Sequence, residues 1–561
     1  MDRRAALVLL AVLGTGVFLS GLELMITAVA LPAIVADLGT WTDLRHASWI
    51  INAYLLVYVG TMPLAGRLAD LWGVRRLFLG ALVFFTVGSL LAGSAGSMDG
   101  LIVGRIVQAL GGGALVPVAT AAASHLYEGH ARPRALGVIG ALTFLGMAAG
   151  PFLGAAILGA FRPEAALARL GVLGGPLLAL MTPVWRWVFF VNVPIGIAAL
   201  ALGWAATAGW DTPRTRASLD LAGATLFTFA ASSILLGVTL LGESGGASAT
   251  RGLDSTLLSA GLVVIGIAAG IAAVVHGLRR PDPFLDPRLF GNRVFSSAAL
   301  VSLLTGYGFA TAIVGAAVFV DRVLYGGPDQ QRVALGALAG ATAVGALASG
   351  WLVRRFSLRT VSVVGLAASV AGLAWMGTWT AGVGLAEVAA GGGLFGLGFG
   401  LTVTPRSTAA VEAVGRHRFG AASATVTVAR MIGMAIGLAV LTAYGSTAIS
   451  RLSAEVYASP DAYRSIVPAT LAARPLRDPL VVNALEAWAA QKAAETMVVL
   501  FIVAAGVTAV AVPAALALGE RPRMLSTETG APARAGAGGS GDGGDAADGA
   551  DAGERGPITF A

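Results

Sequence analysis

Cysteine is absent from the 561 residues, and lysine occurs only at Lys492. The lack of cysteine excludes a disulfide framework, a thiol nucleophile and a cysteine-bound metal. Charged residues make up 12% of the chain, whereas they make up about a quarter of an average soluble domain. A chain with so few charges is not an ordinary soluble globular protein.

Motifs for catalysis and cofactor binding are missing as well. The sequence has no phosphate-binding loop ending in Gly-Lys-Ser or Gly-Lys-Thr, and the glycine-rich run from Gly391 to Gly400 follows no predicted strand. The histidines lack the spacing of metal ligands. We therefore expect no cofactor, no bound metal and no enzymatic activity.

Long apolar runs, in contrast, are abundant. Hydrophobic residues make up 56% of the chain and the mean hydropathy is +0.80. Runs of roughly 20 apolar residues recur, which is the length a helix needs to cross about 30 Å of hydrocarbon. Many of the 77 glycines fall within these runs, which favours closely packed helices. We predict an all-α polytopic membrane protein with about fourteen spans.

The first apolar run contains Glu23 and is longer than the core of a signal peptide, so we expect a retained span and not a cleaved leader. The predicted spans are Ala5–Val29, Ser48–Gly66, Leu77–Ser94, Leu101–Ser124, Ala135–Ala160, Trp187–Ala208, Leu219–Leu241, Ser255–Gly277, Val294–Val320, Val333–Val353, Thr360–Thr380, Leu385–Ala410, Ala421–Tyr444 and Met497–Leu518.

The net charge of +7 and the pI near 10.2 would suggest nucleic-acid binding in a soluble protein. Here arginine pairs fall in alternate connections between the predicted spans, and the positive-inside rule places such connections in the cytoplasm. We therefore expect no nucleic-acid partner and two cytoplasmic termini. The pairs are Arg3 and Arg4, Arg75 and Arg76, Arg132 and Arg134, Arg214 and Arg216, Arg279 and Arg280, Arg354 and Arg355, Arg416 and Arg418, and Arg521 and Arg523.

An internal repeat divides the chain. At identical spacing, 284 residues later, the positions of Gly66, Asp70, Gly73 and Arg75 are taken by Gly350, Arg354, Ser357 and Arg359, a degenerate echo. Transporters are often built from such repeats, with substrate held between them near the bilayer midplane. The predicted units are an N-terminal six-span bundle at 1–212, an inserted two-span linker at 213–280, a C-terminal six-span bundle at 281–519 with a long outward loop at 446–496, and a disordered cytoplasmic tail at 520–561.

Ionisable residues inside predicted spans are the first candidates for function, because a charge in the bilayer is costly unless it has a partner, a cavity or a proton. Glu23, in the first span, suits a group that binds and releases a proton. The alternative is a neutral glutamate that only joins helices by hydrogen bonds. Arg430, about ten residues into the thirteenth span, needs an anion. Glu23 is a candidate partner, although it lies about two turns further from the cytoplasmic end.

Three further polar residues belong to this candidate central cavity. Arg105 and Gln108 lie one turn apart on the fourth span, and we expect both to line the interior. The alternative for Arg105 is a structural anchor at the cytoplasmic end. Asp321 ends the ninth span, and its alternative is an ordinary interfacial charge.

A motif after the second span predicts a breakable cytoplasmic latch. It consists of Gly66, Asp70, Gly73, Arg75 and Arg76. Gly66 permits a close helix contact, and Asp70 can accept hydrogen bonds from an arginine or from a helix N-terminus.

A second motif lies in the fifth span. Gly146, Gly150 and Gly154 recur every four residues and form one smooth helix face, and Pro151 adds a bend. This pattern predicts a moving helix interface, and the alternative is static packing.

Together these motifs resemble the fourteen-span drug:proton antiporter branch of the major facilitator superfamily, over almost the whole chain before the tail. The matching segments are Leu22–Pro32, Leu64–Asp70, Gly150–Pro151 and Trp185–Pro194. The resemblance implies a proton-coupled antiporter in the bacterial plasma membrane, exporting hydrophobic or amphiphilic compounds such as drugs by alternating access. It also implies that Glu23 replaces the aspartate usual in that family.

A narrower resemblance, in Ala422–Ala424, in Val428–Gly437 and in the long last outward connection, is to the mycobacterial triacylglyceride and drug exporters. It implies an alternative function, lipid export to the outer leaflet, with cargo passed to an extracytoplasmic lipoprotein. Those exporters have an acidic residue in the fifth span where Phe144 stands here, so a proton route through that position does not carry over.

The expected partners are protons, membrane lipids and a small hydrophobic or lipid substrate. A reading from another class is a non-transporting membrane scaffold or sensor. The charges inside the spans argue against it.

Overall fold

The computed structural model describes residues 3–519 except 39–43, 130, 170–173, 209, 211, 213–219, 245–248, 282, 284–285, 416–417 and 458–461. Within these residues the chain is helical, without a strand. Several predicted features lie outside them, namely Arg214, Arg216, Arg416, Arg521, Arg523 and the tail at 520–561.

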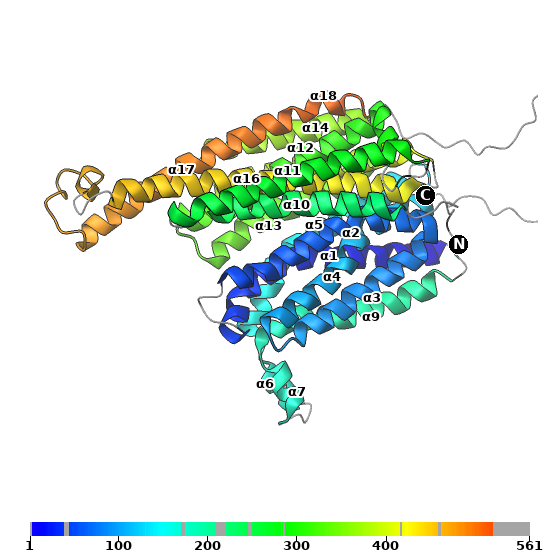
Figure 1. The fold of residues 1–561 in the computed structure, drawn as a ribbon, viewed down its shortest axis with the longest axis horizontal. Coiled ribbons are helices and arrows are strands. Elements are labelled where there is room, and N and C mark those ends of the chain that lie inside the picture. The colour runs from blue at the N-terminus through cyan, green and yellow to red at the C-terminus, as the bar shows by residue number, and fades with distance from the viewer. Residues whose placement is uncertain are drawn as a thin grey trace, which may run out of the picture.

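Two helical bundles lie side by side (Figure 1). The first contains α1 (Arg3–Leu38), α2 (Leu44–Trp72), α3 (Val74–Gly93), α4 (Met98–Leu126), α5 (Ala131–Ala160), and a sixth span made of η2 (Val184–Arg186), α8 (Trp187–Phe190) and α9 (Asn192–Ala206). The second contains α12 (Arg293–Arg322), α13 (Pro328–Leu352), α14 (Leu358–Met376), α15 (Leu385–Glu412), α16 (Phe419–Tyr457), and α17 (Pro479–Ala509) followed by α18 (Ala511–Ala515). Short helices outside the bundles are α6 (Pro163–Arg169), α7 (Pro176–Met181), η3 (Pro287–Gly291) and η5 (Ala462–Ser465).

The inserted helices α10 (Leu221–Ser244) and α11 (Ala249–Arg279) form an antiparallel pair beside the bundles. α10 packs against α2 of the first bundle and against α16 of the second, so the pair covers the line where the two bundles meet. Most of the apolar span of α11 is exposed, as expected for a helix that faces lipid.

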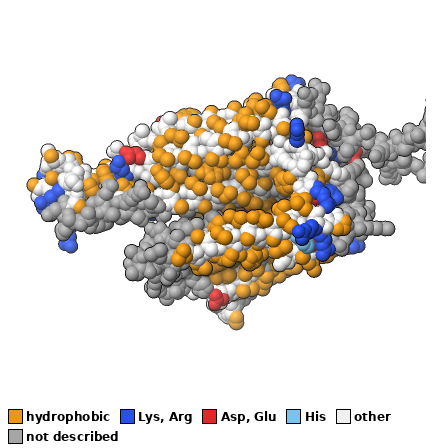
Figure 2. Space-filling view, turned by 45° about the horizontal axis from the view of Figure 1, so that its top comes forward, with side chains coloured by type: hydrophobic (Ala, Val, Ile, Leu, Met, Phe, Trp, Pro, Cys, Tyr) orange, Lys and Arg blue, Asp and Glu red, His pale blue; other side chains and the backbone are white. Residues whose placement is uncertain are grey.

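The apolar length of the helices confirms the predicted fold class. Thirteen helices among the described residues are long and apolar enough to cross a membrane, and Leu221–Ile234 in α10 is a shorter apolar segment. Hydrophobic side chains cover the flank of the bundle, and arginines gather at one end (Figure 2). We call this end, where α1 begins and α2 ends, the basic end.

The two bundles contact each other through equivalent helices, α2 with α16 and α5 with α13. The repeated glycines lie in these contacts. A Cβ atom on Gly66 would meet the backbone of Gly420, and one on Gly350 would meet the backbone of Pro133. At both places the absence of a side chain lets two helices approach closely near the basic end.

The last two long helices extend beyond the rest of the bundle at the end opposite the basic end (Figure 1). α16 has 39 residues and therefore measures about 58 Å, whereas the hydrocarbon core is about 30 Å thick. Together with α17 it forms a projecting arm, closed by η5 and turns between residues 462 and 478. The helix-like patterning at both ends of the long outward loop therefore belongs to continuous helices.

Candidate functional site

Glu23 lies inside the first bundle, on the face of α1 that packs against α4 and α9, and its side chain is fully buried. Its Oε1 accepts hydrogen bonds from Thr27 Oγ1, at 2.9 Å, and from the guanidinium of Arg105. Its Oε2 accepts one from Asn192 Nδ2, at 2.7 Å. These three groups all donate to the carboxylate, and the pair with Arg105 brings an opposite charge into the helix bundle.

Arg105 is held from several sides and is 1% exposed. Its Nη1 also donates to Gln108 Oε1 at 2.6 Å, and its Nε donates to the carbonyl oxygen of Ile50 at 3.3 Å. The guanidinium carbon lies 3.9 Å from the ring centroid of Tyr54, a cation–π contact. These contacts fix the guanidinium opposite Glu23, as the counter-ion of the acid.

A chain of hydrogen bonds continues from this ion pair. Gln108 Nε2 donates to Ser89 Oγ at 2.6 Å, and Asn192 Nδ2 lies 3.3 Å from the same oxygen. Four helices therefore meet at one polar cluster, which we call the Glu23 cluster: Glu23, Thr27, Ser89, Arg105, Gln108 and Asn192. A buried network of this kind is stable only while its members stay paired, so gain of a proton by Glu23 would force it to rearrange.

The structure brings Glu23, Arg105 and Gln108 together, as the sequence predicts for interior residues. The alternative reading of Arg105 as a cytoplasmic anchor is wrong, because Arg105 lies seven residues after the start of α4, at the end of the bundle opposite the basic end. Asp321 is not part of the cluster. Its side chain is 49% exposed at the end of α12 and pairs with Arg322 at 3.0 Å, as an interfacial charge does.

Arg430 lies apart from the Glu23 cluster. Among the described residues no ion pair joins its guanidinium to a carboxylate, and its Nε has no acceptor. The ring centroid of Phe144 lies 5.4 Å from its guanidinium carbon, and Tyr58 also interacts with it electrostatically. A desolvated cation–π contact contributes about 2 kcal/mol or somewhat more, whereas burial of a charge costs several kcal/mol.

The glycine motif of α5 packs against the segment of α1 that carries Glu23. A Cβ atom on Gly146 would collide with the carbonyl oxygen of Phe18, and one on Gly150 would lie 3.0 Å from the Ile26 nitrogen. Gly154 lies against Ile26 and Val29. Backbone therefore meets backbone on both sides of Glu23, so α5 and α1 are in close contact along this segment.

Asp70 joins the two bundles at the basic end. Its carboxylate oxygens accept hydrogen bonds from the backbone nitrogens of Gly420, at 2.8 Å, and Ala421, at 2.9 Å. Of the two partners that the sequence allowed, arginine or a helix N-terminus, the structure has the second, the first turn of α16. Gly66 packs on the same turn.

The other residues of this motif hold the turn between α2 and α3. Gly73 has a φ of 89°, a conformation that favours glycine, and it allows α3 to begin one residue after α2 ends. Arg75 Nε donates to Thr207 Oγ1 at 2.9 Å, which ties α3 to the end of α9. Arg76 is exposed at the basic end.

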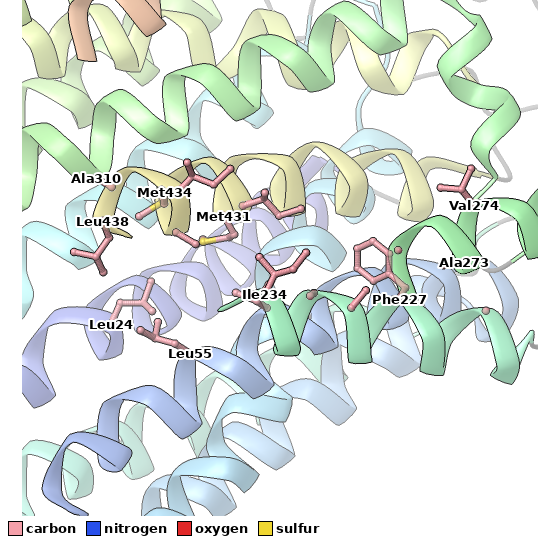
Figure 3. A pocket seen from close by; sticks show the side chains of 18 of the residues that line it. Leu24, Leu55, Phe227, Ile234, Ala273, Val274, Ala310, Met431, Met434 and Leu438 are labelled. Atoms are coloured by element: carbon pink, nitrogen blue, oxygen red, sulfur yellow. The ribbon is translucent and has the colours of Figure 1, made fainter. Parts of the chain in front are cut away.

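A large apolar cavity lies between the two bundles and the inserted pair (Figure 3). Its volume is about 500 Å³, within the range of about 300–1,000 Å³ that is typical of sites for drug-sized ligands. Among the described residues of its lining, Asp220 is the only charged one, and it contacts His276. The other residues include Leu24, Leu55, Phe227, Ile234, Ala273, Val274, Ala310, Met431, Met434 and Leu438.

The inserted helices contribute one face each to this cavity. Gly223, Phe227, Ala230 and Ile234 of α10 line it, at intervals of three or four residues. Gly270, Ala273, Val274 and Gly277 of α11 lie at positions i, i+3, i+4 and i+7, which also form one helix face. The linker is thus part of the cavity wall and more than a connection between the bundles.

Sequence reasoning missed several residues of the site. Asn192 lies in the segment Trp185–Pro194 but was not predicted as a site residue. An amide within an apolar run is a signal that could have identified it. Arg406 is 2% exposed in α15 and meets the criterion that selected Arg430. Nothing in the sequence indicates that α10 and α11 line the cavity, because that depends on how the linker folds back onto α2 and α16.

Comparisons with known proteins agree with this architecture. The sequence model of the Major Facilitator Superfamily matches residues 13–438. The crystal structure of the human organic anion transporter MFSD10 superposes with a TM-score of 0.56, covering 91% of this chain and all of that one. Its sequence is 15% identical, so this likeness concerns the fold alone.

Curated relatives are more similar in sequence. A triacylglyceride transporter of Mycolicibacterium hassiacum is 30% identical over 449 residues, 77% of this chain and 78% of that protein. A multidrug resistance protein B homolog of Mycobacterium tuberculosis is 30% identical over 430 residues, 75% and 72% of the two chains. The cephamycin export protein of Amycolatopsis lactamdurans is 32% identical over 458 residues, 79% and 85% of the two chains.

Proposed function

The chain belongs to the major facilitator superfamily and is a multi-pass membrane transporter, and on that premise we propose that it is a proton-coupled antiporter that exports hydrophobic or amphiphilic compounds. The observation that carries the proposal is the position of α1. Glu23 in α1 is a buried acid with an arginine counter-ion, and the next residue, Leu24, lines the apolar cavity. One helix thus separates a proton-binding group from a space for apolar cargo.

This arrangement supports coupling of the two ligands. Protonation of Glu23 would weaken its attraction to Arg105 and allow α1 to shift against α4. Because Leu24 and Met25 belong to the cavity wall, the same shift would change the cavity. Cargo and proton would then favour different states of one helix, which is what exchange by alternating access requires.

The Asp70 contact supports a role as a latch in that cycle. We take the basic end to be cytoplasmic, because arginine-rich connections remain on that side. The hydrogen bonds from Gly420 and Ala421 to Asp70 then close the cytoplasmic side of the transporter. Few bonds hold this contact, so it can open when cargo enters from the cytoplasm.

Proton-coupled flux in proteoliposomes tests the proposal. With an acidic lumen and the basic end facing outward, protons leave the vesicle, and their exit should drive accumulation of an amphiphilic fluorescent dye inside it. A protonophore should abolish the accumulation, and a sodium gradient of equal size should not replace it. Dye movement at the same rate with and without the pH gradient would contradict proton coupling, while absence of movement for a whole panel of dyes and lipids would contradict export itself.

Lipid export is a second candidate, favoured by the arm of α16 and α17. The arm projects beyond the bundle, so it can shield an apolar molecule that leaves the outer leaflet. Curated relatives of similar length include triacylglyceride transporters, which supports the same reading. An extracytoplasmic lipoprotein would be a suitable acceptor.

Shortening the arm distinguishes the two candidates. Replacement of residues 447–490 by a short Gly-Ser linker should lower the rate of triacylglyceride export by roughly tenfold or more if the arm shields lipid. A tenfold decrease corresponds to an activation free energy for export that is about 1.4 kcal/mol higher. Export of the amphiphilic dye should change little, because the cavity and the Glu23 cluster are untouched. Transport of a labelled triacylglyceride between donor and acceptor vesicles measures the first, and dye flux in the same vesicles is the control. Equal loss of both activities would contradict a specific role in lipid export.

A further inference from the structure

Arg406 and Arg430 are two buried arginines for which the described part of the chain provides no acidic partner. Arg406 lies in α15 and is 2% exposed, and Arg430 lies in α16 and is 8% exposed. Among the described residues, no carboxylate forms an ion pair with either guanidinium. Two like charges buried near each other repel, so their burial without an anion is unfavourable on two counts.

The contacts that these arginines do make are neutral. Arg406 Nη1 donates to Thr305 Oγ1 at 2.7 Å, and its guanidinium carbon lies 5.1 Å from the ring centroid of Phe399. Arg430 lies over Phe144 and leaves its Nε without an acceptor. Phe144 and Phe399 contact each other edge to face, with ring centroids 5.2 Å apart. An aromatic pair therefore supports both cations, but nothing neutralises them.

Both guanidinium groups line a small polar cavity between the two bundles. The cavity has a volume of about 40 Å³, and its lining also includes Thr120 and Thr143 from the first bundle and Ser302 from the second. A cavity needs about 10–15 Å³ to hold one water, so this one has room for a small charged group and not for a whole drug molecule.

The small cavity adjoins the large apolar one along two helices. On α16, Arg430 lines the first and Met431 lines the second. On α5, Thr143 lines the first and Met147, one turn later, lines the second. An anionic group and an apolar body would thus find complementary surroundings within one helical turn of each other.

We propose that Arg406 and Arg430 form a binding site for a single anionic group, and that the cargo is an anionic amphiphile whose carboxylate lies between these arginines and whose apolar part lies in the large cavity. This deepens the export function proposed above and rests on it for the identity of the ligand as cargo. The shared chemistry, one small monovalent anion, also fits chloride, which the experiment separates.

Equilibrium binding to the purified protein in nanodiscs, in chloride-free buffer and without a pH gradient, tests the site. Laurate should bind at least about tenfold more tightly than dodecanol, which has the same chain length and no charge. Arg430→Gln should remove this preference, and so should Arg406→Gln. Arg354→Gln, which removes an exposed arginine of the same bundle, should leave it unchanged.

The arms of the experiment separate the sources of the anion. Competition between chloride and laurate for the wild-type protein supports a shared site. A different result would be equal affinities for laurate and dodecanol, together with chloride binding that Arg430→Gln abolishes. That result would retain the anion site and overturn the anionic amphiphile as cargo. Equal affinities with no effect of chloride overturn the site altogether.

Folding and function are controlled separately. Because Arg430 has no anionic partner, Arg430→Gln should not lower the melting temperature in chloride-free buffer, and a clear decrease would contradict the unpaired state of this arginine. Failure of proton-coupled export would leave the binding preference intact, so the two proposals can fail independently.

Discussion

Glu23→Gln is expected to reduce pH-gradient-driven export to the level of protein-free vesicles. Glutamine has nearly the same shape and can still accept hydrogen bonds from Thr27 and Arg105 through its amide oxygen. It carries no charge and binds no proton near neutral pH, so the two protonation states that drive the cycle become one. The change therefore removes the coupling chemistry and keeps the shape of the side chain, but it leaves the buried Arg105 without its counter-ion, so export has to be compared at equal amounts of folded protein.

The measurement is dye accumulation in proteoliposomes that contain equal amounts of folded wild-type or variant protein. Dye binding without a gradient should persist in Glu23→Gln, because the large cavity is lined by Leu24 and not by Glu23. Thr27→Val is the matched control, since it removes one hydrogen bond to the acid and keeps the acid itself. Gradient-driven export at the wild-type rate in Glu23→Gln would show that the proton is carried by another group.

The depth of each charge along its helix explains what could be predicted. Glu23 lies 20 residues after the start of α1 at Arg3, so it is about 30 Å from the basic end. Arg430 lies 11 residues into α16, about 17 Å from the same end. The expected offset of about two turns between them is therefore real, and it leaves the two residues without a direct ion pair.

The same arithmetic identifies the partner that was not predicted. α4 runs toward the basic end and finishes at Leu126, so Arg105, 21 residues before that point, is about 32 Å from it. Glu23 and Arg105 thus lie at nearly equal depth. This depth can be counted from the sequence if α4 is taken to run toward the basic end. The alternative interpretation of Arg105 as a cytoplasmic anchor assumed the opposite direction for α4.

Contacts between the bundles were less predictable from the sequence. Asp70 and Gly420 are 350 residues apart, and no local pattern links the carboxylate to that particular helix N-terminus. The contribution of α10 and α11 to the cavity wall was also not predictable. Their apolar faces are equally compatible with a helix pair that is surrounded by lipid on all sides. Periodicity defined the helices and their faces, while the partners of those faces depend on tertiary packing.

Arg105→Leu is expected to cause the largest loss of stability among single changes in the site. It removes the counter-ion of a fully buried carboxylate and one hydrogen-bond donor to Gln108. Breaking one partner of a buried ion pair typically costs about 3–5 kcal/mol, because the remaining charge stays in a medium of low dielectric constant. The melting temperature of the purified protein in detergent should fall by several degrees, whereas Arg354→Leu, at an exposed position, should change it little.

Combining Arg105→Leu with Glu23→Gln should restore most of that stability, because the double variant buries neither charge. The wild type, the two single variants and the double variant form a double-mutant cycle, and its coupling energy measures the interaction between Glu23 and Arg105. If Arg105→Leu and the double variant melt at the same low temperature, Arg105 acts through its contacts with Tyr54 and Ile50 and the ion pair is not the stabilising element. Recovery of stability without recovery of export would instead separate two roles of the pair: its charges would be dispensable for the fold and required for the proton.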